Sequence, residues 1–108
     1  MATIVYNIRV DSDDNVTVTT KPPAPSFKLG KDSVRFKSND PAAAIQYVGT
    51  SPFSDPAVKA GKLLKLGPSG KGPFKIVNPG KHHFVCGRFA SGKFSSWGGG
   101  GGDTPVEP

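Results

Sequence analysis

Glycine and proline interrupt this chain so often that only short regular elements fit between them. The 108 residues include 14 glycines and 11 prolines, and the apolar residues between these breaks often recur at every second position. Alternation with a period of two is typical of a β-strand with one buried face. Short strands separated by many turns favour a β-sandwich over a helical fold. We therefore expect a single all-β domain.

Seven short strands can be placed by this alternation and by the turn residues around them. The polar cluster Asp11–Asn15 turns the chain between the first two strands, which we expect to form a hairpin. At most one short turn of helix is expected within residues 54–60, where Asp55 precedes Pro56. The expected strands cover residues 3–10, 16–20, 33–38, 42–48, 61–66, 74–77 and 81–89.

The apolar positions of these strands make up a modest expected core. It consists of Ile4, Tyr6, Ile8, Val10, Val16, Val18, Val34, Phe36, Ile45, Tyr47, Leu64, Leu66, Phe74, Ile76, Phe84 and Val85. After Trp97 the sequence changes to five consecutive glycines and a short polar end, a composition typical of flexible chain. We expect a β-sandwich domain at residues 1–97 and a flexible Gly-rich C-terminal tail at residues 98–108.

The charge is basic but dispersed. The formal net charge is +6, and it divides into −2 for residues 1–20 and +8 for residues 21–108. The lysines occur singly, which favours solvent-facing positions and sheet edges over a nucleic-acid-binding arm. No segment has the pattern of a signal peptide or the length of a membrane span, and the cysteine at position 86 has no second cysteine to pair with. We expect a cytoplasmic protein that does not contact membranes.

Both histidines and the single cysteine lie within five positions, at His82, His83 and Cys86. Imidazole and thiolate are donors that transition metals favour. On a strand, however, His83 points away from the face shared by His82 and Cys86, and those two lie about 13 Å apart. A metal site here would therefore need donors from another strand or a second chain, and we expect no cofactor. The alternative for Cys86 is a small buried hydrophobic residue.

Aromatic residues alternate with cations near the end of the chain. Rings beside cations are a common way to hold single-stranded nucleic acid or another polyanion. The candidate binding residues are Lys81, Arg88, Phe89, Lys93 and Trp97. The alternative is that these rings pack under the last loop and close one end of the domain.

Two stretches of the sequence resemble the cupredoxin family. Residues 33–40 (SVRFKSND) look like the family's V-x-F-x-N strand, and residues 74–87, with Pro79-Gly80 and then Cys86, look like the approach to its cysteine strand. The resemblance covers roughly residues 30–97 and implies a Greek-key β-sandwich with a blue-copper centre. The family's first histidine would fall near residues 43–46, where this chain has no suitable ligand, and no histidine or methionine follows Cys86. The resemblance therefore implies the fold without the copper site.

No set of residues converges on a recognisable catalytic pattern, so an enzyme is the least expected class. We expect a non-enzymatic module that binds a protein partner or serves a structural role. Two alternatives stay open. One is a basic face that binds nucleic acid or another polyanion, and the other is a degenerate or partner-completed metal site at His82, His83 and Cys86.

Overall fold

The computed structural model describes residues 2–108, and Met1 lies outside the described residues. The described residues form strands and one 3-10 turn, so the all-β prediction is confirmed. No helical segment within residues 2–108 reaches the length and hydropathy of a membrane span. The elements in chain order are β1 (Ala2–Val10), β2 (Val16–Lys21), β3 (Phe27–Lys28), β4 (Asp32–Ser38), β5 (Ala43–Val48), η1 (Pro56–Val58), β6 (Leu63–Lys65), β7 (Lys71–Lys75), β8 (Gly80–Ala90) and β9 (Lys93–Glu107).

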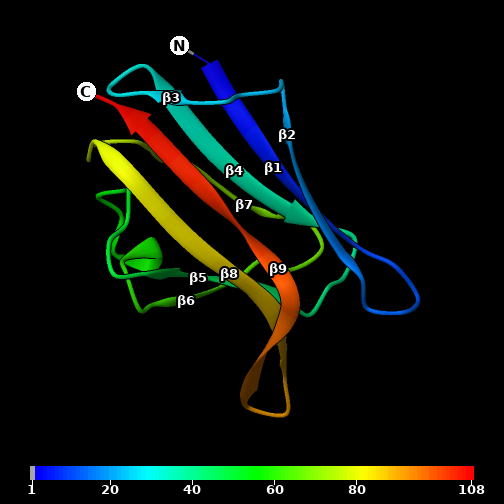
Figure 1. Ribbon diagram of the computed structural model, residues 1–108. Coiled ribbons are helices and arrows are strands. Elements are labelled where there is room, and N and C mark those ends of the chain that lie inside the picture. The colour runs from blue at the N-terminus through cyan, green and yellow to red at the C-terminus, as the bar shows by residue number, and fades with distance from the viewer. Residues whose placement is uncertain (1) are drawn as a thin grey trace.

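The strands form two sheets that pack on each other (Figure 1). The first sheet has the order β2-β1-β4-β7, and β1 runs parallel to β4 with Tyr6 beside Phe36. The second has the order β3-β9-β8-β5-β6, and β3 runs parallel to β9. The chain therefore leaves the first sheet after the β1–β2 hairpin and joins the second at β3. The edge strands are β2 and β7 in one sheet and β3 and β6 in the other.

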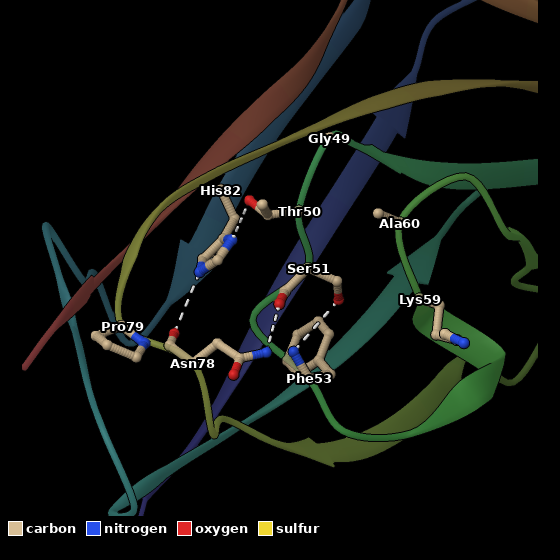
Figure 2. A pocket seen from close by; sticks show the side chains of 9 residues that line it. All are labelled: Gly49, Thr50, Ser51, Phe53, Lys59, Ala60, Asn78, Pro79 and His82. Atoms are coloured by element: carbon tan, nitrogen blue, oxygen red, sulfur yellow. Dashed lines mark hydrogen bonds between the residues drawn. The ribbon is translucent and has the colours of Figure 1, made fainter.

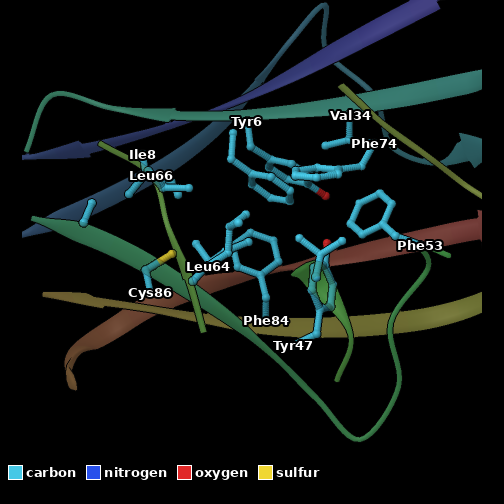
Figure 3. Close-up of a cluster of buried hydrophobic side chains, with 14 of the residues drawn as sticks. Tyr6, Ile8, Val34, Tyr47, Phe53, Leu64, Leu66, Phe74, Phe84 and Cys86 are labelled. Atoms are coloured by element: carbon cyan, nitrogen blue, oxygen red, sulfur yellow. The ribbon is translucent and has the colours of Figure 1, made fainter. Parts of the chain in front are cut away.

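Alternate residues of both sheets fill the space between them with a cluster of aromatic rings (Figure 3). Phe36 lies among the others, with ring centroids 5.3 Å from Tyr6 and 5.8 Å from Phe84. The predicted core is largely confirmed, although Val16, Val18 and Val85 are only half-buried. The buried side chains that alternation did not predict include Phe27, Ala43, Phe53, Val58, Cys86, Trp97 and Val106.

The predicted β1–β2 hairpin is confirmed, and its acidic turn is held by Asp11. The carboxylate Oδ1 of Asp11 accepts hydrogen bonds from the backbone N–H groups of Asp13 at 2.8 Å and Asn15 at 2.9 Å. The Asp11 N–H in turn donates to the Asn15 carbonyl at 3.0 Å. The hydrogen bond from Asn15 is the main cause that lowers the pKa of the Asp11 carboxyl. This closure fixes the register in which Val10 pairs with Val16.

The structure differs from the expected flexible tail at residues 98–108. Strand β9 continues to Glu107, and its segment 101–106 pairs with residues 80–85 of β8. The strand passes the glycine tract through a shift of register, in which residues 97–100 stand against Cys86 alone. Glycine is required in this region, since a Cβ atom on Gly101 would lie 2.6 Å from the Phe84 carbonyl oxygen and one on Gly102 2.8 Å from its ring.

Buried polar contacts then anchor the end of β9. Thr104 is fully buried, and its hydroxyl lies 2.9 Å from the hydroxyl of Tyr6 and 2.7 Å from that of Tyr47. Tyr6 also donates to the carbonyl of Asp103 at 2.8 Å. The glycine tract is therefore followed by an ordered strand that belongs to the core.

Candidate functional site

A hollow of about 510 Å³ lies beside His82, between the loop that follows β5 and the segment that precedes β8 (Figure 2). Buried Phe53 contributes its ring to the apolar part of the lining. Thr50, Lys59 and Asn78 line the same hollow and are exposed residues. The hollow therefore combines an apolar surface with a hydroxyl, an amide and a cation.

His82 is the polar side chain most deeply enclosed by these loops, with an exposed fraction of 4%. Its Nδ1 lies 2.7 Å from the hydroxyl oxygen of Thr50, and its Nε2 lies 3.2 Å from the backbone carbonyl oxygen of Asn78. A carbonyl only accepts, so Nε2 carries a hydrogen and donates, and in the neutral ring Nδ1 accepts from Thr50. Both nitrogens therefore take part in hydrogen bonds, and the single lone pair of the neutral ring, on Nδ1, is not free for a metal.

The walls of the hollow are tied by their own hydrogen bonds. Ser51 donates through its hydroxyl to the Val58 carbonyl at 2.6 Å, and the side-chain amide of Asn78 donates to the Ser51 carbonyl at 2.9 Å. The predicted helical turn is confirmed as η1, where Asp55 accepts from the N–H of Ala57 at 2.9 Å. These bonds make the hollow a preformed feature, which is typical of a binding site.

His83 lies on the opposite face of β8, as the alternation predicts. Its Nδ1 is 2.9 Å from a carboxylate oxygen of Asp103, which is its cross-strand neighbour in β9. Both side chains are more than half exposed, so the pair contributes little to stability. The two neighbouring histidines therefore take part in separate interactions.

Cys86 is fully buried, and its sulfur points into the layer between the sheets (Figure 3). Burial raises the pKa of its thiol from 9.0 to about 12. The thiol is therefore protonated at neutral pH, whereas metal binding and nucleophilic attack both require the thiolate. The alternative expectation for this residue, a small buried hydrophobic side chain, is the one that the structure shows.

The donors that the cupredoxin resemblance implies do not fit a copper ion. Buried Ala43 and Ala44 occupy the region where the first histidine is expected, and Ala44 pairs with Gly87, next to Cys86. No group of three His, Cys, Asp or Glu side chains within residues 2–108 is arranged to hold a metal ion. The structure therefore does not bring His82, His83 and Cys86 together.

The residues of the candidate polyanion face divide between the two ends of β8. Lys81 lies near the start of β8, about 23 Å along the strand from Arg88. Arg88, Lys93 and Trp97 line one hollow of about 260 Å³ at the other end. Nearby in sequence, the ring of Phe89 lies under the ammonium nitrogen of Lys65, 4.2 Å from the ring centroid.

Arg88 is paired with acidic residues that the sequence pattern did not single out. Its guanidinium lies 2.9 Å from Asp14 and 3.0 Å from Asp40, and its carbon Cζ lies 5.4 Å from the centre of the Trp97 ring. The hydrogen bond to Asp14, followed by that to Asp40, raises the pKa of Arg88 above its usual range. Trp97 itself has an exposed fraction of only 8%. The positive charge of Arg88 and the ring of Trp97 are thus largely engaged in contacts within the protein.

Comparison with known proteins finds no family model, no curated protein and no solved structure that matches the chain.

Proposed function

We propose that this chain is a non-enzymatic binding module, a β-sandwich of cupredoxin-like topology without a functional copper site. The observation that carries the proposal is the separation of the three donor side chains. His82 uses both ring nitrogens to hold two loops, His83 pairs with Asp103 on the other face, and Cys86 is a protonated core residue.

The strand connections support the finer assignment of the fold. Both strands of the β1–β2 hairpin belong to one sheet, and the chain then crosses to β3 in the other sheet. A connection of this kind suits a Greek-key sandwich. Val34 and Phe36 of the resembling segment both point into the core from β4, and Cys86 lies on β8.

The hollow beside His82 is the best candidate for the contact with a partner. Its surface is preformed, and exposed Val48 and Val77 directly precede Gly49 and Asn78 of its lining. A preformed hollow that combines an apolar surface with a few polar groups favours a partner that inserts an apolar side chain. The exposed ammonium of Lys59 favours an acidic group on that partner. We propose that the hollow accepts an apolar side chain next to a carboxylate.

A panel of displayed peptides, selected on the folded protein, tests where binding occurs. Selected peptides are expected to lose affinity for the Lys59→Glu variant and to keep it for Lys37→Glu, which changes an exposed lysine of β4 in the other sheet. Peptides that bind both variants equally would place the contact elsewhere. Titration with cobalt(II) separately tests the metal alternative: a charge-transfer band that Cys86→Ser abolishes would overturn the proposal.

A further inference from the structure

One of the four sheet edges is much less protected than the others. Natural proteins guard free edges with proline, with lysine or by keeping the strand short. Strand β7 contains Pro73 between two lysines, β6 has three residues and ends at Lys65, and β3 has two residues. Strand β2, in contrast, reads VTVTT before its first charge at Lys21. It is therefore the edge best suited to accept another strand.

The hairpin closure determines which backbone groups of β2 are free. The bond from the Asp11 N–H to the Asn15 carbonyl starts the ladder between β1 and β2. In an antiparallel pair, hydrogen-bonded and non-hydrogen-bonded positions alternate from that point. Residues 17, 19 and 21 therefore bond toward β1, whereas Val16, Val18 and Thr20 direct their N–H and C=O groups away from it. A hollow of about 450 Å³, lined in part by Val18 and Thr20, lies beside this strand.

We propose that two copies of the chain associate through this edge, with β2 antiparallel to β2 of the second copy about a two-fold axis. The register that uses the free groups pairs Val18 with Val18 and Val16 with Thr20. Each such pair exchanges two backbone hydrogen bonds, and the two four-stranded sheets become one continuous sheet. A two-fold contact requires a surface that complements itself, and the alternating free positions of β2 meet this condition.

Charge favours a second copy over an unrelated strand. In this register Lys21 lies opposite Asn15 of the second copy, at the end of an acidic turn that contains three aspartates. Residues 1–20 carry a net charge of −2, and the remaining chain, which begins at Lys21, carries +8. The two-fold symmetry produces this contact between Lys21 and the acidic turn twice. The complementary charges would orient the two strands before they pair.

Two double variants test the register. Both change Thr17 and Thr19, so the substituted positions have the same neighbours within the protomer. Thr17 is exposed and pairs with Arg9 in its own sheet, and the proposed register places it opposite Thr19 of the second copy. T17E/T19K brings opposite charges together across the contact, whereas T17E/T19E brings like charges together. Both variants carry the same carboxylate beside Arg9, so the substitution at position 17 affects each protomer equally. By analytical ultracentrifugation, the T17E/T19E dissociation constant is expected to exceed that of T17E/T19K by about tenfold or more.

Three results would overturn the proposal. One is a wild-type protein that stays monomeric up to about 1 mM, the weakest association of interest. Another is equal association of the two double variants. The third is a concentration-independent exchange rate for the amide hydrogens of Val16, Val18 and Thr20, measured by NMR on the wild type. Association through β2 is expected to slow exchange at these amides and leave Thr17 and Thr19 unchanged.

A third variant keeps the test decisive if a double variant does not fold. Lys21→Glu places a carboxylate at the acidic turn of the second copy and is expected to weaken association. Lys75→Glu makes the same charge change on β7, at the opposite edge of the same sheet, and is expected to have no effect. Equal weakening by both would contradict the proposed contact. The hollow beside His82 is not used here, so the two proposals succeed or fail separately.

Discussion

The two ends of β8 accommodate their polar side chains in opposite ways. Near the start, His82 is enclosed by loops and satisfied by a hydroxyl and a backbone carbonyl, without any charge partner among its hydrogen bonds. Near the other end, Arg88 is partly exposed and is held by the carboxylates of Asp14 and Asp40. The first arrangement depends on burial and hydrogen-bond geometry, and the second depends on electrostatics. Single substitutions can separate these two sources of stability.

The largest expected effect is that of His82→Ala. The change leaves a cavity at a site with 4% exposure and removes both bonds that join the loops. We expect the free energy of unfolding to fall by about 2–4 kcal/mol. Chemical denaturation followed by the fluorescence of Trp97 measures this. Thr50→Val, which removes only one of these two bonds and creates no cavity, is the comparison and should cost less. A His82→Ala loss as small as about 0.5 kcal/mol, the usual size at a surface position, would contradict the description.

Arg88→Met is expected to have a smaller effect with a different dependence on salt. Methionine keeps much of the aliphatic stem, but Asp14 and Asp40 lose their cation. The melting temperature should fall by less than in His82→Ala, and the difference from the wild type should shrink in about 1 M salt because exposed ion pairs are screened. Lys93→Met, at an exposed lysine of the same end, is the control. A deficit that does not change with salt would argue that packing dominates at Arg88.

Acid should weaken the Arg88 end through Asp40. Burial acts to raise the pKa of this carboxyl, but the hydrogen bonds from the Ala42 N–H and from Arg88 outweigh it, so the pKa lies below its usual value. A carboxyl with a lowered folded-state pKa stabilises the protein above the unfolded-state value, and this stabilisation is lost as the pH falls through the folded-state value. The stability gap between wild type and Asp40→Asn should therefore close below about pH 4. A gap that is constant from neutral to acidic pH would contradict this.

The smallest expected effect is that of an oligonucleotide on Trp97. Its ring is nearly buried, and the neighbouring guanidinium is already matched by two carboxylates. Fluorescence at low salt should therefore stay unchanged when single-stranded DNA is added. Salt-dependent quenching would favour the polyanion-binding alternative instead.

Local sequence pattern predicted the elements whose burial alternates and missed those that distant contacts create. Alternation identified β1 and β4 because every second residue there faces the core. It also placed His82 and His83 on opposite faces. It could not identify β3, where Phe27 follows a proline-rich stretch and pairs with Val106. No local signal connects Arg88 with Asp14, which is 74 positions away.

The glycine tract shows why composition alone was misleading. Consecutive glycines are typical of a linker when nothing packs against them. Here Gly101 and Gly102 pass close to Phe84, where a side chain would collide with its carbonyl group or ring. The same glycine-rich composition that predicts a flexible linker therefore also permits close packing between strands. Only the presence of an opposing strand distinguishes these two outcomes.

The mismatch opposite Cys86 gives β9 a tolerance for changes of length. Because residues 97–100 face one residue of β8, the pairing before them and the pairing after them are set independently. A residue added or removed within this stretch would leave Thr104 and Val106 in their places. A one-residue change that would reverse the faces of an ordinary strand is absorbed at this point.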